Sequence, residues 1–419
     1  MATETATRTT PGEVPGPPPR HPRYPLSEGA RALSVVAVML CHAWLFTGGF
    51  GGFTGSLPNR LMVRLDGAVA IFFFLSAFLL YRPMIAHRAG GPPSPGVADY
   101  ARRRILRIYP AYWVALTVLA IVPGLVGVFS DHWFAFYSLG FYLDLANASK
   151  ACIGEPGYRC GLPQSWTLTV DMTFYLILPL YLAVTSLLAR RRGLASWVRL
   201  ELGLLALLCA ASVVIGAFDN DVRQAFLFRF SFAGHFFWLG LGLAAAVISV
   251  AAENRREALP GALRWAAEHP GACWAAAGAI WLIEVLTLFP APFTVAPVGP
   301  GGYIAMQLLP GVVGALLLIP VCFADPNKGV PARSLGNPVV MWVGMISYSL
   351  YLWSTTITVD VGVAGAEKGF LVTTVLTFLI AIPVAAASFY LIERPTMSLK
   401  YRSPLTALRE RRRRVRTQA

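Results

Sequence analysis

Residues 67–83, GAVAIFFFLSAFLLYRP, contain no charged side chain before Arg82. A stretch this long and this apolar can cross the ~30 Å hydrocarbon core of a bilayer as a helix. Similar stretches recur along the 419 residues, of which 56% are hydrophobic and 13% charged, whereas a soluble domain has about 25% charged residues. This composition excludes an ordinary soluble protein, a disordered chain and a nucleic-acid-binding module, and predicts an all-α polytopic membrane protein.

Hydropathy predicts about ten transmembrane helices. They lie near 31–50, 66–83, 109–129, 166–189, 198–217, 229–251, 272–289, 303–323, 339–359 and 370–392. The tails and the loops on one side contain 27 of the 35 Lys and Arg residues, and the opposite loops contain seven. By the positive-inside rule, both termini are cytoplasmic and the chain is a multi-pass protein of the inner (cytoplasmic) membrane.

One aromatic segment could add a span. Residues 131–145, DHWFAFYSLGFYLDL, would as an extra helix move Arg190, Arg191 and Arg192 to the outer side, against the charge rule. We therefore interpret the segment as interfacial or re-entrant.

The two ends of the chain differ from the rest in composition. Residues 1–27 are rich in Pro, Thr and Gly, and predict a disordered cytoplasmic tail. Residues 397–419 contain RERRRRVR, and predict a basic cytoplasmic tail that contacts anionic lipids. The transmembrane domain is expected over 28–396.

The first span contains two polar residues on nearly one helix face. Arg31 and His42 are eleven residues apart, which is close to three turns and a rise of ~16 Å. His42 is thus expected deep in the membrane, where an ionisable residue indicates a functional site. Imidazole suits proton transfer near neutral pH. The alternative is a histidine that only packs against a neighbouring helix.

Six arginines are expected at the cytoplasmic mouths of the first three spans. Guanidinium groups hold phosphates through paired hydrogen bonds, so these arginines could bind a phosphate-rich ligand; alternatively, they are only topology signals. They are Arg31, Arg82, Arg102, Arg103, Arg104 and Arg107.

Polar residues in later spans suggest an outer part of the site. Asp171 lies about one turn inside the outer face and could orient His42 or share its proton transfer, or could simply bond a neighbouring helix. Trp166 and Thr167 lie at the outer interface, and Tyr348 brings a hydroxyl into the ninth span. The roles of His235 and Glu284 stay open. The sequence contains no metal-ligand spacing, so no metal and no bound cofactor are expected.

Two cysteines share one outer loop. Cys152 and Cys160 are separated by seven residues in KACIGEPGYRCG, whose glycines and proline permit a tight turn. Thiols on the outer side can oxidise. A Cys152–Cys160 disulfide is predicted beside Trp166.

The ordered set of motifs resembles the acyltransferase-3 family of integral-membrane acyltransferases, in a stand-alone form without an appended SGNH-type esterase domain. The matching segments are EGARALSVVAVMLCH, GAVAIFFFLSAFLLYRP, RRRILRIYPAYW, QSWTLTVDMTFYLILPLYL, VGMISYSLYLW and YLIERP. The family often has glycine at Ala77, glutamate at Asp171 and histidine near Trp353 and Ser354.

The resemblance implies transfer of an acyl group, usually acetyl from acetyl-coenzyme A, to a hydroxyl. The six arginines would bind the acyl donor, His42 and Asp171 would be catalytic, and Trp166, Thr167 and Tyr348 would line the acceptor side. The expected acceptor is a cell-surface or extracellular glycan. A small metabolite such as a macrolide is an alternative, and a proton-coupled transporter or flippase is an alternative of another class.

Overall fold

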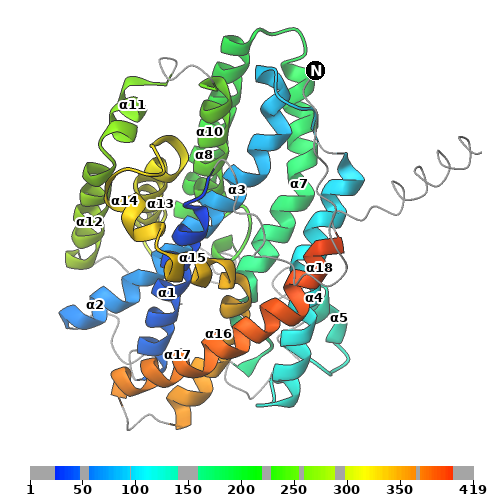
Figure 1. Ribbon diagram of the computed structural model, residues 1–419, viewed down its shortest axis with the longest axis vertical. Coiled ribbons are helices and arrows are strands. Elements are labelled where there is room, and N and C mark those ends of the chain that lie inside the picture. Colours follow the sequence, from blue (N-terminus) through cyan, green and yellow to red (C-terminus); the bar gives the residue numbers. More distant parts are fainter. Residues whose placement is uncertain are drawn as a thin grey trace, which may run out of the picture.

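The computed structural model describes residues 24–47, 56–94, 96–139, 159–218, 228–253, 259–287, 298–364 and 369–399. These parts of the chain are helical, and within them the only strand-like pairing is an isolated bridge between Val126 and Cys160. The molecule is an all-α bundle (Figure 1). Nearly all of both predicted tails lies outside the described residues.

Seven helical segments in the described parts of the chain are long and apolar enough to cross a membrane. They are Ser27–Phe46 (α1), Leu57–Ala89 (including α3, Val69–Ile85), Val97–Ile121 (α4), Pro163–Leu188 (including α7, Trp166–Leu188), Leu194–Ala217 (α8), Pro300–Phe323 (α13) and Gly369–Ser398 (including α17, Gly369–Ser388). Two shorter apolar helices are Phe236–Ala251 (α10) and Pro270–Leu286 (α12). The prediction of a polytopic α-helical membrane protein is confirmed.

Each of the ten predicted spans coincides with a helix, with two differences. The ninth span is broken at Ile346 into Pro338–Met345 (α15) and Ser347–Ala364 (α16). The third begins at Val97 instead of near 109, so the arginine run lies within α4 itself. The short elements are Leu57–Val63 (α2), Arg64–Ala68 (η2), Trp133–Tyr137 (α5), Pro163–Ser165 (η6), Gly261–Glu268 (α11), Gly329–Leu335 (α14), Phe389–Glu393 (η9) and Arg394–Ser398 (α18).

Prolines and polar caps mark where several helices begin. Pro300 and Pro338 occupy first-turn positions of α13 and α15, where the missing N–H costs no hydrogen bond. Asn337 caps α15 by accepting a 2.9 Å hydrogen bond from the backbone N–H of Val339. The start of α15 is therefore fixed by sequence, and α15 packs directly against α1.

Glycines bring helix backbones into direct contact around the site. A Cβ at Gly344 of α15 would lie 1.8 Å from the carbonyl oxygen of Glu28 on α1, and one at Gly242 of α10 would lie 2.3 Å from that of Phe74 on α3. Only glycine permits such approaches, as is common between membrane helices. The first turn of α1, with Glu28 and Arg31, is thereby held in place.

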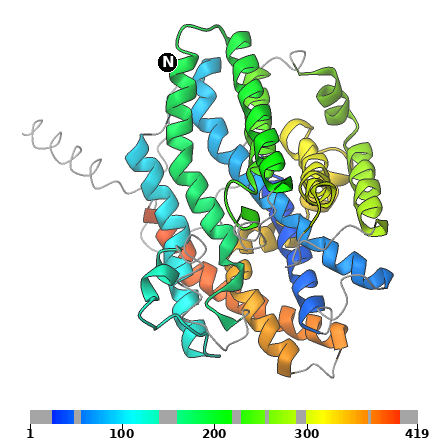
Figure 2. The same cartoon turned by 180° about the vertical axis from the view of Figure 1, so that it is seen from behind.

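The helix ends separate into two groups. At one end lie the C-terminus of α3 and the turn between α7 and α8, and at the other lie the C-terminus of α1 and the start of α17 (Figures 1 and 2). The first group carries Arg82 and Arg190–Arg192. This separation agrees with the two sides expected from the charge pattern.

Within the segment 131–145, the described residues 131–139 do not form a span. Its described part forms α5, which is only five residues long and packs against α4. The Tyr112 hydroxyl donates a 2.6 Å hydrogen bond to the Phe136 carbonyl, and the Trp113 indole donates one of 2.9 Å to the Tyr137 carbonyl. Phe136 is buried in the protein core, whereas Trp133 and Phe134 are exposed.

Candidate active site

His42 is half-buried on α1 and faces α16. Its Nδ1 lies 3.1 Å from Oγ1 of Thr355, which is buried, and its ring centroid is 6.4 Å from that of Phe46. The imidazole is therefore held by one neutral hydroxyl on a neighbouring helix. This partner differs from Asp171, which the sequence suggested for the role.

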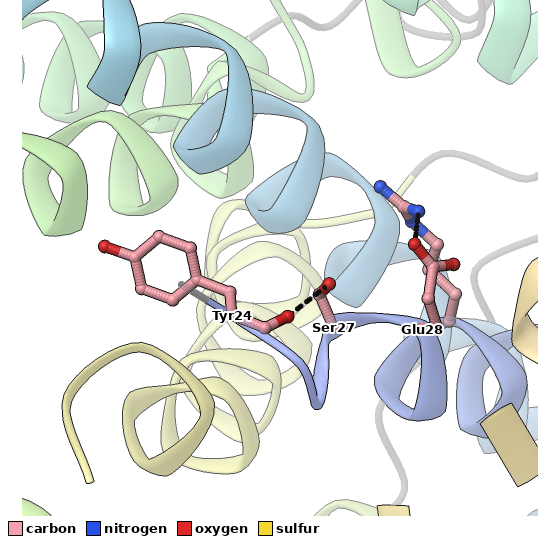
Figure 3. Close-up of polar contacts among 4 residues, drawn as sticks. Tyr24, Ser27 and Glu28 are labelled. Carbon is pink, nitrogen blue, oxygen red and sulfur yellow. Dashed lines mark hydrogen bonds and ion pairs between the residues drawn. The ribbon is translucent and has the colours of Figure 1, made fainter. Parts of the chain in front are cut away.

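Arg31 lies at the other end of α1 and already has an ion-pair partner. Its Nη1 is 2.7 Å from Oε1 of Glu28, one turn earlier (Figure 3). Figure 3 also shows the Ser27 hydroxyl donating a 2.8 Å hydrogen bond to the Tyr24 carbonyl, which closes the turn before the helix. Glu28 also interacts electrostatically with Arg107 on α4.

Arg104 and Arg107 lie on the inward face of α4, one turn apart, and both interact electrostatically with Asp171 on α7. The guanidinium of Arg104 lies over the Tyr175 ring, 5.8 Å from its centroid, which is a cation–π distance. Asp171 accepts a 3.1 Å hydrogen bond from Ser76 of α3. Asp171 is thus positioned with the arginines.

Glu393 completes this network from the last membrane helix. It is 2% exposed, accepts a 3.1 Å hydrogen bond from the Ser349 hydroxyl and interacts electrostatically with Arg107. It ends η9, a π-helical turn between α17 and α18; such turns occur frequently at functional sites. We call the following set the inner charge network: Glu28, Arg31, Arg104, Arg107, Asp171 and Glu393.

Helix α16 connects His42 with the inner charge network. Tyr351, one turn before Thr355, shares a 2.7 Å hydrogen bond with Thr167 and donates one of 2.9 Å to the Gln164 carbonyl. Tyr351 also interacts electrostatically with Asp171, which lies one turn after Thr167 on α7. Polar side chains spaced one turn apart on α16 and α7 therefore lie between His42 and Asp171: Thr355, Tyr351 and Thr167.

Three of the predicted donor-binding arginines do not join the network. Arg82 is buried against α10, where its Nε donates a 2.9 Å hydrogen bond to Ser249 and its Nη2 lies 3.3 Å from Oε2 of Glu253. Arg102 donates a 2.6 Å hydrogen bond to the Leu399 carbonyl. Arg103 points outward and is exposed. The helical period of α4 turns Arg102 and Arg103 away from the face that carries Arg104 and Arg107.

The predicted acceptor-side residues Tyr348 and Trp166 lie in different surroundings. Tyr348 donates a 2.8 Å hydrogen bond to the Ile108 carbonyl and interacts with Arg107, so it lies beside the inner charge network instead of on the acceptor side. Trp166 packs in an aromatic group with Phe73 and His235, whose ring centroids lie 6.2 and 4.9 Å away. The His235 ring is enclosed there, and its Nδ1 lies 3.3 Å from the Ser231 carbonyl.

Two residues that the sequence singled out lie away from the network: Cys160, predicted in a disulfide, and Glu284, whose role was left open. Cys160 is disulfide-bonded, and its predicted partner Cys152 lies outside the described residues. Glu284 lies 3.7 Å from Arg64, with both side chains buried. No group of three or more potential metal-ligating residues occurs in the described ranges.

Sequence reasoning missed Glu28, Ser76, Glu393, Tyr351 and Thr355. For Glu393 a signal existed, since a glutamate at the end of an apolar helix was visible, but the π-helical turn that buries it was not. Tyr351 stood in the hydroxyl-rich stretch of the ninth span, without evidence for the helix it would face. Thr355 carried no signal, because a threonine in a membrane helix usually bonds its own helix backbone.

Taken together, the structure is that of a polytopic membrane protein with an imidazole and an arginine–carboxylate network inside one helical bundle. The model of the acyltransferase-3 family, described as an acyltransferase domain, matches residues 27–394. The chain belongs to this family and is an enzyme that transfers acyl groups.

Similar curated proteins support this membership. Nodulation protein 10 of Rhizobium leguminosarum bv. viciae is 27% identical over 88% of this chain and 92% of its own length. The exopolysaccharide production protein ExoZ of Rhizobium meliloti is 29% identical over 78% of this chain and 88% of its own length. The putative peptidoglycan O-acetyltransferase YrhL of Bacillus subtilis is 25% identical over 92% of this chain, and the match covers 56% of that protein's length. No solved structure matches the chain.

Proposed function

We propose that this enzyme transfers an acyl group, in the first instance acetyl, from acyl-coenzyme A to a hydroxyl of a cell-surface or extracellular glycan. The observation that carries the proposal is the set of polar side chains, spaced one turn apart on α16 and α7, between the inner charge network and His42. It would let a polyanionic donor and a neutral hydroxyl approach from opposite ends and meet within the bundle.

The donor would bind at the inner charge network. Arg31, Arg104 and Arg107 are accompanied by Glu28, Asp171 and Glu393, which balance their charge when no ligand is bound. A buried guanidinium without such a partner would be strongly unfavourable. The phosphates of coenzyme A could replace these carboxylates, because they offer the same paired acceptor geometry.

Asp171 would then act through the arginines. Its hydrogen bond from Ser76 and its interaction with Arg104 and Arg107 hold two guanidinium groups on one face of α4. The pantetheine arm of the donor would extend from there along Tyr351 towards His42. This assignment replaces direct orientation of the imidazole by a carboxylate.

His42 would act as the general base. Its ring would take the proton of the acceptor hydroxyl as the oxygen attacks the thioester carbonyl carbon. The C–S bond then breaks, and the coenzyme A thiolate takes up the proton from the imidazolium, so that one ester and one free thiol are formed. The other possibility, an acyl-His42 intermediate, leads to the same products.

The glycan acceptor is favoured by topology and by the relatives. The positive-inside rule places the His42 end of α1 towards the outer side of the cytoplasmic membrane, where glycans are accessible. One similar protein is named for exopolysaccharide production, and another is named a putative peptidoglycan O-acetyltransferase.

The proposal is tested with the full chain in lipid nanodiscs, by measuring release of free coenzyme A thiol from acetyl-coenzyme A. Release should depend on an added polysaccharide or peptidoglycan fragment, and mass spectrometry should find the acetyl ester on the glycan. Thiol release that is independent of every glycan tested, or that occurs only with a small hydroxylated metabolite, would contradict the glycan assignment.

A further inference from the structure

The proposed base, His42, has a hydroxyl contact whose purpose the proposed function does not yet explain. Of the other buried polar groups, Glu201 is enclosed by the Tyr81 hydroxyl and the Trp197 indole, and Glu284 by Arg64, so both are explained as internal partners. Thr355 differs because its hydroxyl contacts the proposed base. We infer that Thr355 is a positioning residue, which holds His42 in the tautomer that leaves Nε2 free to accept a proton.

The contact between His42 and Thr355 is short, and Thr355 is buried. Nδ1 of His42 and Oγ1 of Thr355 are 3.1 Å apart, and Thr355 is only 3% exposed, so water cannot readily replace it. The helices are also closely packed beyond this level, because a Cβ at Gly362 of α16 would lie 2.9 Å from the Phe46 carbonyl oxygen on α1. The hydroxyl thus has a fixed position relative to the ring.

Hydrogen bonds near Thr355 hold α16 in place. One turn before Thr355, the Tyr351 side chain is bound by Thr167 and by the Gln164 carbonyl. The Gln164 amide in turn donates a 2.8 Å hydrogen bond to the Leu352 carbonyl. These contacts fix α16 against η6 and the start of α7, so that Thr355 cannot rotate away without breaking them.

The consequence of this contact for the chemistry of the imidazole rests on the proposed function. A neutral imidazole has one N–H and one lone pair, and the hydrogen bond made by one nitrogen determines which form the other takes. Because Nδ1 is occupied by Thr355, Nε2 is the nitrogen left for the acceptor hydroxyl. For Nε2 to receive a proton, Nδ1 must carry the hydrogen and Thr355 Oγ1 must accept it.

The same contact would serve after proton transfer. In the imidazolium both ring nitrogens carry hydrogen, and the Nδ1–H bond to Thr355 is retained and strengthened as a charge-assisted hydrogen bond. A hydroxyl is a weaker hydrogen-bond acceptor than a carboxylate. Thr355 therefore stabilises the imidazolium of His42 less than a carboxylate would.

The chain offers a matched control beside Thr355. Thr356 is also 3% exposed and lies on the same helix, and its hydroxyl has no hydrogen-bond partner among the described residues. Thr355→Val and Thr356→Val therefore each replace a buried hydroxyl by a methyl group. Of the two hydroxyls, the one that contacts His42 belongs to Thr355.

The experiment measures kcat, the KM for acetyl-coenzyme A and the pH–rate profile of Thr355→Val, Thr355→Ser and Thr356→Val. Loss of a partner that orients a metal-ligating histidine typically costs ~10–100-fold; by the same reasoning Thr355→Val should lose ~10–100-fold in kcat with little change in KM. Thr355→Ser should recover most of the loss, and Thr356→Val should match wild type. The pH–rate profile should shift only in Thr355→Val.

A second readout does not depend on activity. In protein labelled with 15N-histidine, the ring nitrogens of His42 should report an Nδ1–H tautomer in wild type and Thr355→Ser, and a mixture in Thr355→Val. Equal kcat in Thr355→Val and Thr356→Val, or an unchanged tautomer, would overturn the inference. Full activity in His42→Ala would instead contradict the proposed function, so that the two failures are distinguishable.

Discussion

The start and the middle of α16 have different electrostatic surroundings. At its start, Tyr348 and Ser349 lie among guanidinium and carboxylate groups of the inner charge network. Two turns later, Thr355 offers His42 a single neutral hydroxyl. The first environment suits the binding of a charged ligand by exchange of ionic partners. The second suits a base, because a nearby carboxylate would favour the protonated ring.

The same contrast appears within α4. Arg104 and Arg107 face the bundle and interact with Asp171, whereas Arg102 contacts the Leu399 carbonyl and Arg103 is exposed. Four arginines within six residues therefore have different surroundings, set by the helical period. A ligand that enters the bundle would meet only the first pair.

The largest effect is expected at His42. His42→Ala should lower kcat by ~10²–10⁴-fold, which is the usual contribution of general acid–base catalysis. His235→Ala is the matched control, since its imidazole is also buried but is enclosed by Phe73, Trp166 and Trp238. The assay is initial-rate transfer by protein that elutes as a single species in size-exclusion chromatography. Similar losses of kcat in the two variants would contradict a specific catalytic role for His42.

The inward-facing arginines should give the next largest effect. Replacing Arg104 and Arg107 together by Gln should raise the KM for acetyl-coenzyme A by ~10–100-fold, because hydrogen bonds to charged groups contribute about 1.5–3 kcal/mol. The KM for the glycan should stay nearly constant. Steady-state kinetics with each substrate varied separately checks this, and an equal rise in both KM values would indicate a general disturbance of the bundle.

Arg82 should affect stability and leave donor binding unchanged. Arg82→Gln removes the partner of Glu253 and the bond to Ser249, at a cost of about 1–3 kcal/mol. The melting temperature in detergent should fall, and the KM for acetyl-coenzyme A should remain within about twofold. A selective rise in that KM would show that Arg82 contacts the donor after all.

The smallest effect is expected on the outward face of α4. Arg103→Gln should lower kcat/KM for the donor by no more than ~3-fold at low salt, since exposed charges act mainly by long-range attraction. The difference from wild type should vanish near 0.5 M salt, where such attraction is screened. An effect that persists at high salt would mean that Arg103 makes a direct contact.

The sequence predicted the spans well because each depends on length and apolarity alone. It predicted the position of His42 and Arg31 on one helix face for a similar reason, since helix geometry relates residues within one element. It did not predict which arginines converge, because that depends on how α4 is rotated against α3 and α7. For the same reason it did not predict that Tyr348 would lie beside Arg107 and the Ile108 carbonyl.

The partners of polar groups were the least predictable part. Asp171 was expected near His42, but its partners come from Ser76 and α4, and Thr355 takes its place. Glu393 becomes buried through a π-helical turn that no local pattern indicated. The contacts of Asp171 and His42 join residues more than 60 positions apart, so they require the packed structure.

The central claim is that donor binding and proton transfer occur at separate ends of one series of polar residues. Equilibrium binding of acetyl-coenzyme A to two variants in nanodiscs tests this claim most directly. His42→Ala should bind the donor with a Kd within about twofold of wild type, although it transfers the acetyl group ~10²–10⁴-fold more slowly. Arg104→Gln combined with Arg107→Gln should weaken binding by ~10-fold or more. Equal weakening in both variants, or unchanged binding in the arginine variant, would contradict the account.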